Sequence, residues 1–268
     1  MLRLMILLMF CWCYSSAALA ESIKPRPKLV WCLDHFPHFH EYEQSNQPTG
    51  PSVALMQELA QRVGFELSVT PRTPIARCLK LMEEGSVDLM SNLRYSDERA
   101  KAMHLIPYST TIAESLFMRQ GDPRQINELV QLNSLIIATI RHYVYSPHLM
   151  QQLSVQSRSI AEVDSIELAL EMLLRGRIDA VVAPTLSTAD VINNNSSYQH
   201  RFMLAPIDFN SITPTWIHIG LSRASSHQQL EASLRQQLQL MVNDGTVQRL
   251  YQHALDRQRL LKSLGALP

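Results

Sequence analysis

The sequence predicts an α/β protein with two similar lobes, on three observations. Apolar strands alternate along the chain with amphipathic helices, a pattern typical of parallel sheets covered by helices. A unit of helix, glycine, aspartate and strand occurs twice, as LKLMEEGSVDLM and LEMLLRGRIDAVV, with Gly85 and Gly176 91 positions apart. The 268 residues, 46% of them hydrophobic, suffice for one large domain or two small ones. A single α/β domain with repeated helix–glycine–strand units would also produce this echo.

The elements of the first half follow from apolar spacing and from end signals. Helices are indicated by apolar residues three or four apart with a glycine after the last turn, and strands by short apolar runs. Ser96 fits the N-cap of a short helix, because its hydroxyl can accept a backbone N–H. The predicted strands are 28–33, 65–70, 87–90 and 112–118, and the predicted helices are 51–63, 75–84 and the short one after Ser96.

The elements of the second half repeat this alternation. Gly176 ends one helix, and Asn243-Asp244-Gly245 separates a long helix from the last one. The predicted strands are 134–139, 178–182 and 215–221, and the predicted helices are 144–153, 166–174, 227–242 and 246–255.

Residues 1–20 have the features of a secretory signal peptide. Arg3 precedes an apolar run over 4–14, and Ala18-Leu19-Ala20 resembles a cleavage site. The run is shorter than the roughly 20 residues that cross a bilayer, and an uncleaved membrane anchor is the alternative. We therefore expect export of a chain in which no later segment is long and apolar enough to span a membrane.

Cleavage at this site would leave two cysteines, Cys32 and Cys78. Two cysteines in an oxidising compartment favour one disulfide. Two buried free thiols are the alternative, because the sequence does not give the distance between the two Cα atoms.

Composition excludes several classes of function. Lys and Arg number 24, as do Asp and Glu, so the chain lacks the basic excess that a nucleic-acid partner favours. The eight glycines are too scattered for a dinucleotide fingerprint or a P-loop, and we predict no cofactor. The G-x-S-x-G motif of serine hydrolases is also absent from the sequence.

The densest group of potential metal ligands is His35, His38, His40 and Glu41, which Asp34 could join. Zinc needs three or four ligands that converge, and the spacing of these residues within a loop does not provide that. We predict no metal site. These side chains are expected to be solvated, or one of them to contact a ligand.

Arg99 is the first candidate for ligand binding. It lies one turn after Ser96, where a guanidinium beside free backbone N–H groups makes a good receptor for a carboxylate. A surface arginine paired with Asp97 or Glu98 is the alternative interpretation.

Two further segments follow predicted strands, where loops line the ligand crevices of open α/β sheets. Phe36 begins FPHF at 36–39 and could form a stacking wall, or pack into the core. Arg141-His142-Tyr143 follows the strand at 134–139 and could donate hydrogen bonds into a cleft, or form a surface turn.

Four groups of short motifs occur in order between about residues 28 and 251, and their order and spacing are more specific than any one of them. Together they resemble the family 3 extracellular solute-binding proteins, the periplasmic amino-acid receptors of ABC importers. The motifs are FPHF at 36–39, before a helix that opens after Gly50; EGSVD at 84–88, SDER at 96–99 and LIPY at 105–108; GRIDA at 176–180; and GLSR at 220–223 with NDGT at 243–246.

The resemblance implies a periplasmic-binding-protein-like fold: two α/β lobes joined by a hinge, with a ligand cleft between them. The chain would cross between the lobes near 111–113 and 213–217. The expected organisation is a signal peptide at 1–20, a first lobe formed by 28–112 and 216–268, and a second lobe formed by 113–215.

The resemblance also implies roles for individual residues. Arg99 matches the arginine that grips the ligand's carboxylate, and Phe36 matches the aromatic that packs on the ligand. Residues 92–96 match a segment of polar contacts, and Tyr143 falls where the family often has a threonine that touches the carboxylate. The predicted ligand-binding residues are Phe36, Asn92, Arg94, Ser96, Arg99, Arg141 and Tyr143, and no catalytic residue is predicted.

The sequence departs from the family pattern at three positions. Pro184 stands where amino-acid-binding members carry an acidic residue for the α-ammonium, His38 replaces a proline, and His142 replaces a glycine. The ligand is therefore expected to be a carboxylate without an α-amino group, or an amine held by Glu114 or Asp190.

By resemblance the chain is expected to be a monomeric periplasmic receptor and not an enzyme. It would close on a small-molecule solute and deliver it to a membrane ABC permease. The alternatives are a sensory module that docks on a signalling partner, or an enzyme of the dehydratase or lytic-transglycosylase type on the same scaffold. Glu41 and Glu114 are the nearest carboxylates for such an enzyme.

Overall fold

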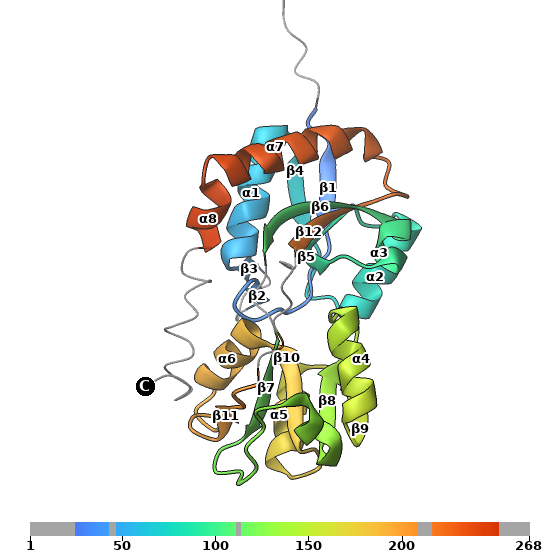
Figure 1. Ribbon diagram of the computed structural model, residues 1–268. Helices are drawn as coiled ribbons and strands as arrows, with labels where there is room; N and C mark the ends of the chain where they lie inside the picture. Colours follow the sequence, from blue (N-terminus) through green and yellow to red (C-terminus); the bar gives the residue numbers. More distant parts are fainter. Residues whose placement is uncertain (1–24, 43–46, 111–113, 208, 210–215, 252–268) are drawn as a thin grey trace, which may run out of the picture.

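The protein consists of two α/β lobes, one above the other in Figure 1, each built on its own five-stranded sheet. The computed structural model describes residues 25–42, 47–110, 114–207, 209 and 216–251. The predicted two-lobed α/β fold is confirmed. The expected signal peptide and most of the two expected crossings lie outside the described residues.

The first lobe contains both early and late parts of the chain. Its strand order is β4-β1-β5-β12-β6, with β1 parallel to β4 and β5, and β12 antiparallel to β5 and β6. The strands are β1 (Lys28–Trp31), β4 (Glu66–Val69), β5 (Leu89–Arg94), β6 (Met103–Thr110) and β12 (Trp216–Ser222), with a separate pair β2 (Glu41–Tyr42) and β3 (Pro48–Thr49). The helices are α1 (Pro51–Val63), α2 (Ile75–Glu84), α3 (Asp97–Ala102), η2 (Gln228–Leu230), α7 (Glu231–Asn243) and α8 (Thr246–Tyr251).

The second lobe is formed by one stretch of chain. Its strand order is β11-β7-β10-β8-β9, with β8 parallel to β9 and β10, and β7 antiparallel to β10 and β11. The strands are β7 (Glu114–Arg119), β8 (Ile136–Ile140), β9 (Ser159–Val163), β10 (Ala180–Pro184) and β11 (Phe202–Leu204). The helices are η1 (Leu129–Ser134), α4 (Pro147–Gln156), α5 (Ile166–Leu174) and α6 (Thr185–Asn193).

The parallel pairing expected from the alternation of strands and helices is present in both sheets, but each sheet also contains antiparallel strands, so both sheets are mixed. The antiparallel members β7 and β12 are the strands by which the chain enters a sheet after passing from the other lobe, between Thr110 and Glu114 and between Leu204 and Trp216. A strand that arrives from the other lobe need not follow a helical crossover, which is what imposes parallel pairing.

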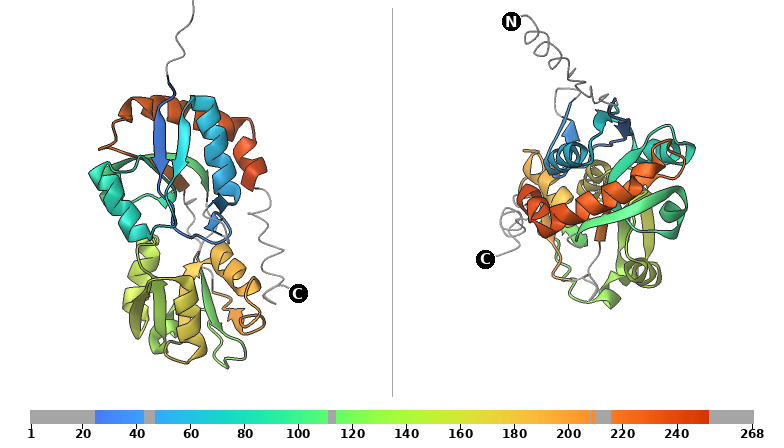
Figure 2. Two further views of the ribbon diagram at one scale, coloured as in Figure 1. Left: turned by 180° about the vertical axis from the view of Figure 1, so that it is seen from behind. Right: turned by 90° about the horizontal axis from the view of Figure 1, so that it is seen from above.

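Alternation along the central strands gives each sheet two apolar faces. In β10, Val181 and Ala183 pack with α5 and α6, whereas Ala180 and Val182 pack with η1 and α4. The helices therefore cover both sides of each sheet, as the two opposite views in Figures 1 and 2 show. Among the described residues, Leu186 of α6 makes an apolar contact between the lobes: it is 3% exposed and belongs to the core of the first lobe.

The repeated sequence unit has the same structural role in both lobes. Gly85 and Gly176 follow α2 and α5 with φ of 70° and 68°, a left-handed conformation that glycine adopts without strain. Asp88 then donates its N–H to the Val30 carbonyl at 2.8 Å and accepts the Val30 N–H through Oδ2 at 2.7 Å.

In the second lobe, Asp179 makes the same pair of hydrogen bonds with Ile136, at 2.8 and 2.9 Å. Each aspartate thus holds one strand, β1 in the first lobe and β8 in the second, against the start of the strand that follows the repeated helix. This accounts for the aspartate in both copies of the unit.

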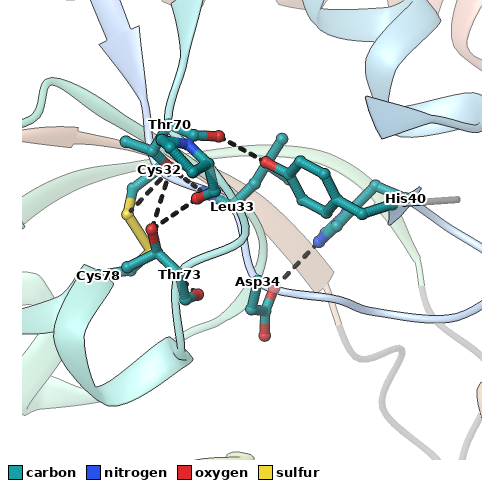
Figure 3. Close-up of a disulfide and its surroundings, with 9 residues drawn as sticks. Cys32, Leu33, Asp34, His40, Thr70, Thr73 and Cys78 are labelled. Atoms are coloured by element: carbon teal, nitrogen blue, oxygen red, sulfur yellow. Dashed lines mark hydrogen bonds and ion pairs between the residues drawn. A yellow bond between two sulfur atoms is a disulfide. The ribbon is translucent and has the colours of Figure 1, made fainter. Parts of the chain in front are cut away.

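Cys32 and Cys78 form a disulfide with a Cα–Cα distance of 5.6 Å, so the alternative of two free thiols does not apply. Figure 3 shows that the bond joins the chain just after β1 to α2. Beside it, the Thr73 N–H donates to the Leu33 carbonyl at 2.9 Å. These links anchor the start of the loop that runs from Leu33 toward the junction of the lobes.

Removing the disulfide should destabilise the first lobe. The bond closes a segment of 46 residues, and the chain-entropy model gives a stabilisation of about 4 kcal/mol for a loop of this length. We expect the double variant Cys32→Ala/Cys78→Ala to lose about that much free energy of unfolding in urea denaturation. Dithiothreitol should lower the free energy of unfolding of the unmodified chain to the value of the double variant. It should leave the free energy of unfolding of the double variant unchanged. A loss below 1 kcal/mol would contradict this role.

Candidate ligand-binding cleft

The two lobes meet around a cavity of about 130 Å³, here called the interlobar cavity. The first lobe contributes the loop after β1, the end of β5 and Arg99 of α3. The second lobe contributes residues 140–144 after β8, residues 164–167 at the start of α5, and Pro184 at the end of β10. Because the carboxyl ends of β1, β5, β8 and β10 all point toward the junction, their loops face one another there.

Arg94 is the last residue of β5 and is 5% exposed. Its Nη1 donates to the Val144 carbonyl of the second lobe at 3.2 Å and forms an ion pair with Glu114 of β7. Its Cζ lies 5.0 Å from the centroid of the Tyr143 ring, within the range of a cation–π contact. Nε and Nη2 are also buried, and neither has a hydrogen-bond acceptor in the part of the chain that the structure describes.

Arg99 is almost as deeply buried, at 8% exposure. Ser96 caps α3 as predicted, accepting the Arg99 N–H at 3.2 Å. The Arg99 side chain donates through Nη1 to the Arg94 carbonyl at 3.0 Å and through Nη2 to the His142 carbonyl at 2.9 Å. Burial lowers the pKa of Arg99 to about 10, so it remains a cation at neutral pH. Arg99 therefore ties the first lobe to the second.

His142 adopts a left-handed conformation with φ of 62°. The family that the sequence resembles has glycine at this position. Histidine is among the few other residues that adopt the left-handed backbone conformation with some frequency. The left-handed turn presents the His142 carbonyl to Arg99. The departure in residue type is thus compatible with the backbone that a glycine would favour.

Asn92 also has a left-handed backbone, with φ of 55°. Its Nδ2 donates to Ser52 Oγ at 2.7 Å and lies 3.2 Å from His40 Nδ1, while its Oδ1 accepts the Tyr108 hydroxyl at 2.6 Å. Asn92 lines the cavity, but its amide is engaged in a network within the first lobe. Its contribution is to hold the cavity wall.

The remaining predicted residues differ in how they reach the cavity. Phe36 lines it and stacks on Phe39, with ring centroids 5.2 Å apart. Arg141 lines it but is half-exposed, and its Nη1 pairs with Asp164 Oδ1 at 2.5 Å. Tyr143 lines it, and burial raises the pKa of its hydroxyl well above the usual range.

Six of the seven predicted ligand-binding residues thus line the interlobar cavity. Ser96 instead lines a wider groove of about 490 Å³, which Arg99 and Tyr143 also border.

Sequence reasoning missed the wall formed by Asp164-Ser165-Ile166-Glu167. They follow β9 (Ser159–Val163), a strand that the apolar pattern does not predict, so the sequence gives no sign of a strand-end loop at this place. Pro184 lines the cavity where the family's acidic residue would stand. Glu114, one proposed substitute for that acid, is paired with Arg94.

A second polar contact between the lobes involves His38, Glu41 and Asp190. His38 Nδ1 lies 3.8 Å from Asp190 Oδ1, and the His38 N–H donates to Glu41 Oε1 at 2.8 Å. Burial raises the pKa of Glu41, and hydrogen bonding to Asp190 adds to that shift. For Asp190, burial is outweighed by hydrogen bonds to His38 and Glu41, so its pKa is lowered. Over the described residues, no group of His, Cys, Asp or Glu is arranged to hold a metal ion.

The Glu41 shift predicts a pH-dependent effect on stability. Because folding raises the pKa of Glu41 above 4.5, the folded state holds the Glu41 proton more tightly than the unfolded state. The contribution of Glu41 to the free energy of unfolding therefore falls as pH rises from 4.5 through the pKa that Glu41 has in the folded state. In Glu41→Gln the amide oxygen can still accept the His38 N–H, but the side chain does not titrate. We therefore expect the stability of this variant, relative to that of the unmodified chain, to increase as pH rises through this range.

Urea denaturation between pH 4 and pH 8 would measure the difference. Glu66→Gln is the matched control, since Glu66 is exposed on β4 and paired with the exposed Lys28. Its effect in the same window is the background, which is subtracted from the Glu41→Gln difference. A Glu41→Gln difference that is flat with pH would contradict the shift.

The chain matches a known protein family over most of its length. The model for bacterial extracellular solute-binding proteins, family 3, matches residues 29–256. The membrane-bound lytic murein transglycosylase F of Idiomarina loihiensis is 24% identical over 153 residues, covering 55% of this chain and 33% of that protein. The L-cystine-binding protein TcyJ of Escherichia coli K12 is 25% identical over 186 residues, covering 68% of each. The chain thus spans only about a third of the transglycosylase.

Solved structures agree in fold at low identity. An ancestral arginine-binding protein bound to arginine superposes with a TM-score of 0.72 at 18% identity, covering 87% of this chain and 100% of that one. A histidine kinase sensor domain with similarity to periplasmic binding proteins gives 0.72 at 18% identity, covering 87% and 97%. No described helix is long and apolar enough to cross a bilayer.

Proposed function

Because the chain belongs to the bacterial extracellular solute-binding proteins, family 3, we propose that it captures a small carboxylate-bearing solute between its lobes and delivers it from the periplasm to an ABC importer. The solute is an amino acid or a close relative. The observation that carries this proposal is the pair of buried guanidinium groups of Arg94 and Arg99 at the interlobar cavity.

Lobe closure supplies the mechanism. A ligand that contacts both lobes binds the closed form better than the open one, and it shifts the population by that difference in affinity. We assign the hinge to the two passages near 111–113 and 213–217, with lobes formed by 28–112 and 216–268 and by 113–215. The switch from β6 to β7 and the return to β12 support these limits.

Ligand chemistry follows from the charged groups at the cavity. Pro184 offers no anion, and the two acids that could replace the family's residue already have partners: Glu114 is ion-paired with Arg94, and Asp190 Oδ1 lies 3.8 Å from His38 Nδ1. We therefore propose that the carboxylate dominates recognition and that an α-amino group contributes little. Phe36, Arg141 and Tyr143 would complete the contacts from the two sides of the cavity.

A thermal-shift screen tests the carboxylate requirement. The panel contains amino acids including L-arginine and L-cystine, dicarboxylates such as succinate, and small amines. A compound at 100 times its Kd should add about 2.7 kcal/mol of stability. L-arginine is compared with agmatine, which lacks the carboxylate, and with 5-guanidinopentanoate, which lacks the α-amino group. We expect agmatine to give no shift and the des-amino acid to retain most of any arginine shift. A preference for amines over carboxylates would refute the proposal.

Uptake measurements test delivery to an importer. Deleting the coding sequence should reduce uptake of the ligand found in the screen at least tenfold, and re-expression should restore it. Unchanged uptake would favour the sensory alternative. Incubation of the purified chain with murein or prephenate should yield no product, and turnover of either would favour an enzyme.

A further inference from the structure

Arg94 and Arg99 line the same cavity but differ in how many of their guanidinium nitrogens already donate hydrogen bonds. Arg99 uses both of its Nη atoms on backbone carbonyls, those of Arg94 and His142. Arg94 uses only Nη1, toward Val144 and Glu114. Arg94 therefore has more donors left to bind an anion than Arg99 has.

The uncommitted atoms of Arg94 form one edge of its guanidinium. The N–H bonds of Nε and Nη2 point in parallel from that edge, which is the geometry that binds both oxygens of a carboxylate. Both atoms are buried without an acceptor among the residues that the structure describes. Arg94 borders the interlobar cavity and also a cavity of about 20 Å³ that Phe36, Tyr143 and Pro184 share.

We propose that the Nε–Nη2 edge of Arg94 binds the ligand's carboxylate, and that Arg99 is a positioning residue that holds the closed arrangement of the lobes. This assignment rests on the proposed function, because it names the group that takes the anion in the same cleft. It differs from the role that family resemblance gives to Arg99.

The surroundings of Arg94 fit this assignment. The ion pair with Glu114 fixes the Nη1 end, and the Tyr143 ring covers one face of the guanidinium. Together they leave the Nε–Nη2 edge as the part of the side chain that can receive a partner.

Arg94 also makes closure conditional on the ligand. Val144 and Tyr143 of the second lobe cover Arg94 in this structure, in which the lobes are in contact, and we take this arrangement as the closed form. Closure without an anion then buries two charged donors without acceptors, which is unfavourable. An anion on the free edge removes that penalty in the closed form only, so it supplies the differential affinity that closure requires.

The same substitution at both positions locates the carboxylate. Lysine keeps the charge but cannot present two parallel N–H groups. We expect Arg94→Lys to weaken binding about 100-fold, the equivalent of about 2.7 kcal/mol, and Arg99→Lys to weaken it no more than about tenfold. Isothermal titration with L-arginine, L-cystine and succinate measures both. Arg235→Gln, on the exposed face of α7, is the control and should bind as the unmodified chain does. A larger loss in Arg99→Lys than in Arg94→Lys would overturn the assignment.

A second variant tests conditional closure without any ligand. Arg94→Met/Glu114→Gln removes the buried cation together with its counter-charge, so no lone buried charge is left to prevent folding. Its radius of gyration by small-angle X-ray scattering should be smaller than that of the ligand-free unmodified chain. An equal or larger radius would overturn the role of Arg94 in closure. If none of the three probes binds the unmodified chain, the carboxylate proposal fails, while this comparison still decides whether Arg94 opposes closure.

Discussion

The buried charge of Arg94 is the constraint on which the cleft depends. A guanidinium removed from water is tolerated only where carboxylate, carbonyl and aromatic groups replace its hydration. Glu114, Val144 and Tyr143 supply three such groups, and all three belong to the second lobe. Groups of the opposite lobe therefore take the place of water around the Arg94 guanidinium. The energy of this buried charge thus depends on the distance between the lobes.

The framework that positions these groups is held by a few side-chain links to neighbouring strands and loops. Asp88 holds β1 and Asp179 holds β8, and the Cys32–Cys78 bond holds the chain where it leaves β1. The cavity loops start from these fixed strand ends, so their side chains converge without long connections. Within β5, Asn92 has a left-handed backbone conformation. Its side chain is held by Ser52, His40 and Tyr108.

Local signals account for what could be predicted. The bounds of α1, α2 and α5 match the predicted ranges, because Gly64, Gly85 and an Arg175-Gly176 stop mark their ends. Strand β6 was missed because Pro107 interrupts its apolar run, and α6 because a polar sequence follows Pro184 directly. Loops at strand ends were correctly expected at the cavity. The free edge of Arg94 could not be predicted, since it depends on the Glu114 pairing, and no local pattern reports a contact between two strands of different sheets.

Leu186 has a thermodynamic consequence for the opening motion. The residue is carried by the second lobe yet is buried in the core of the first. Separating the lobes would wet this side chain and the apolar surface around it, and hydration of apolar surface raises heat capacity. Under the proposed closure mechanism, capture of a solute from the open form would therefore be accompanied by a negative heat-capacity change, and its enthalpy would become more exothermic as temperature rises.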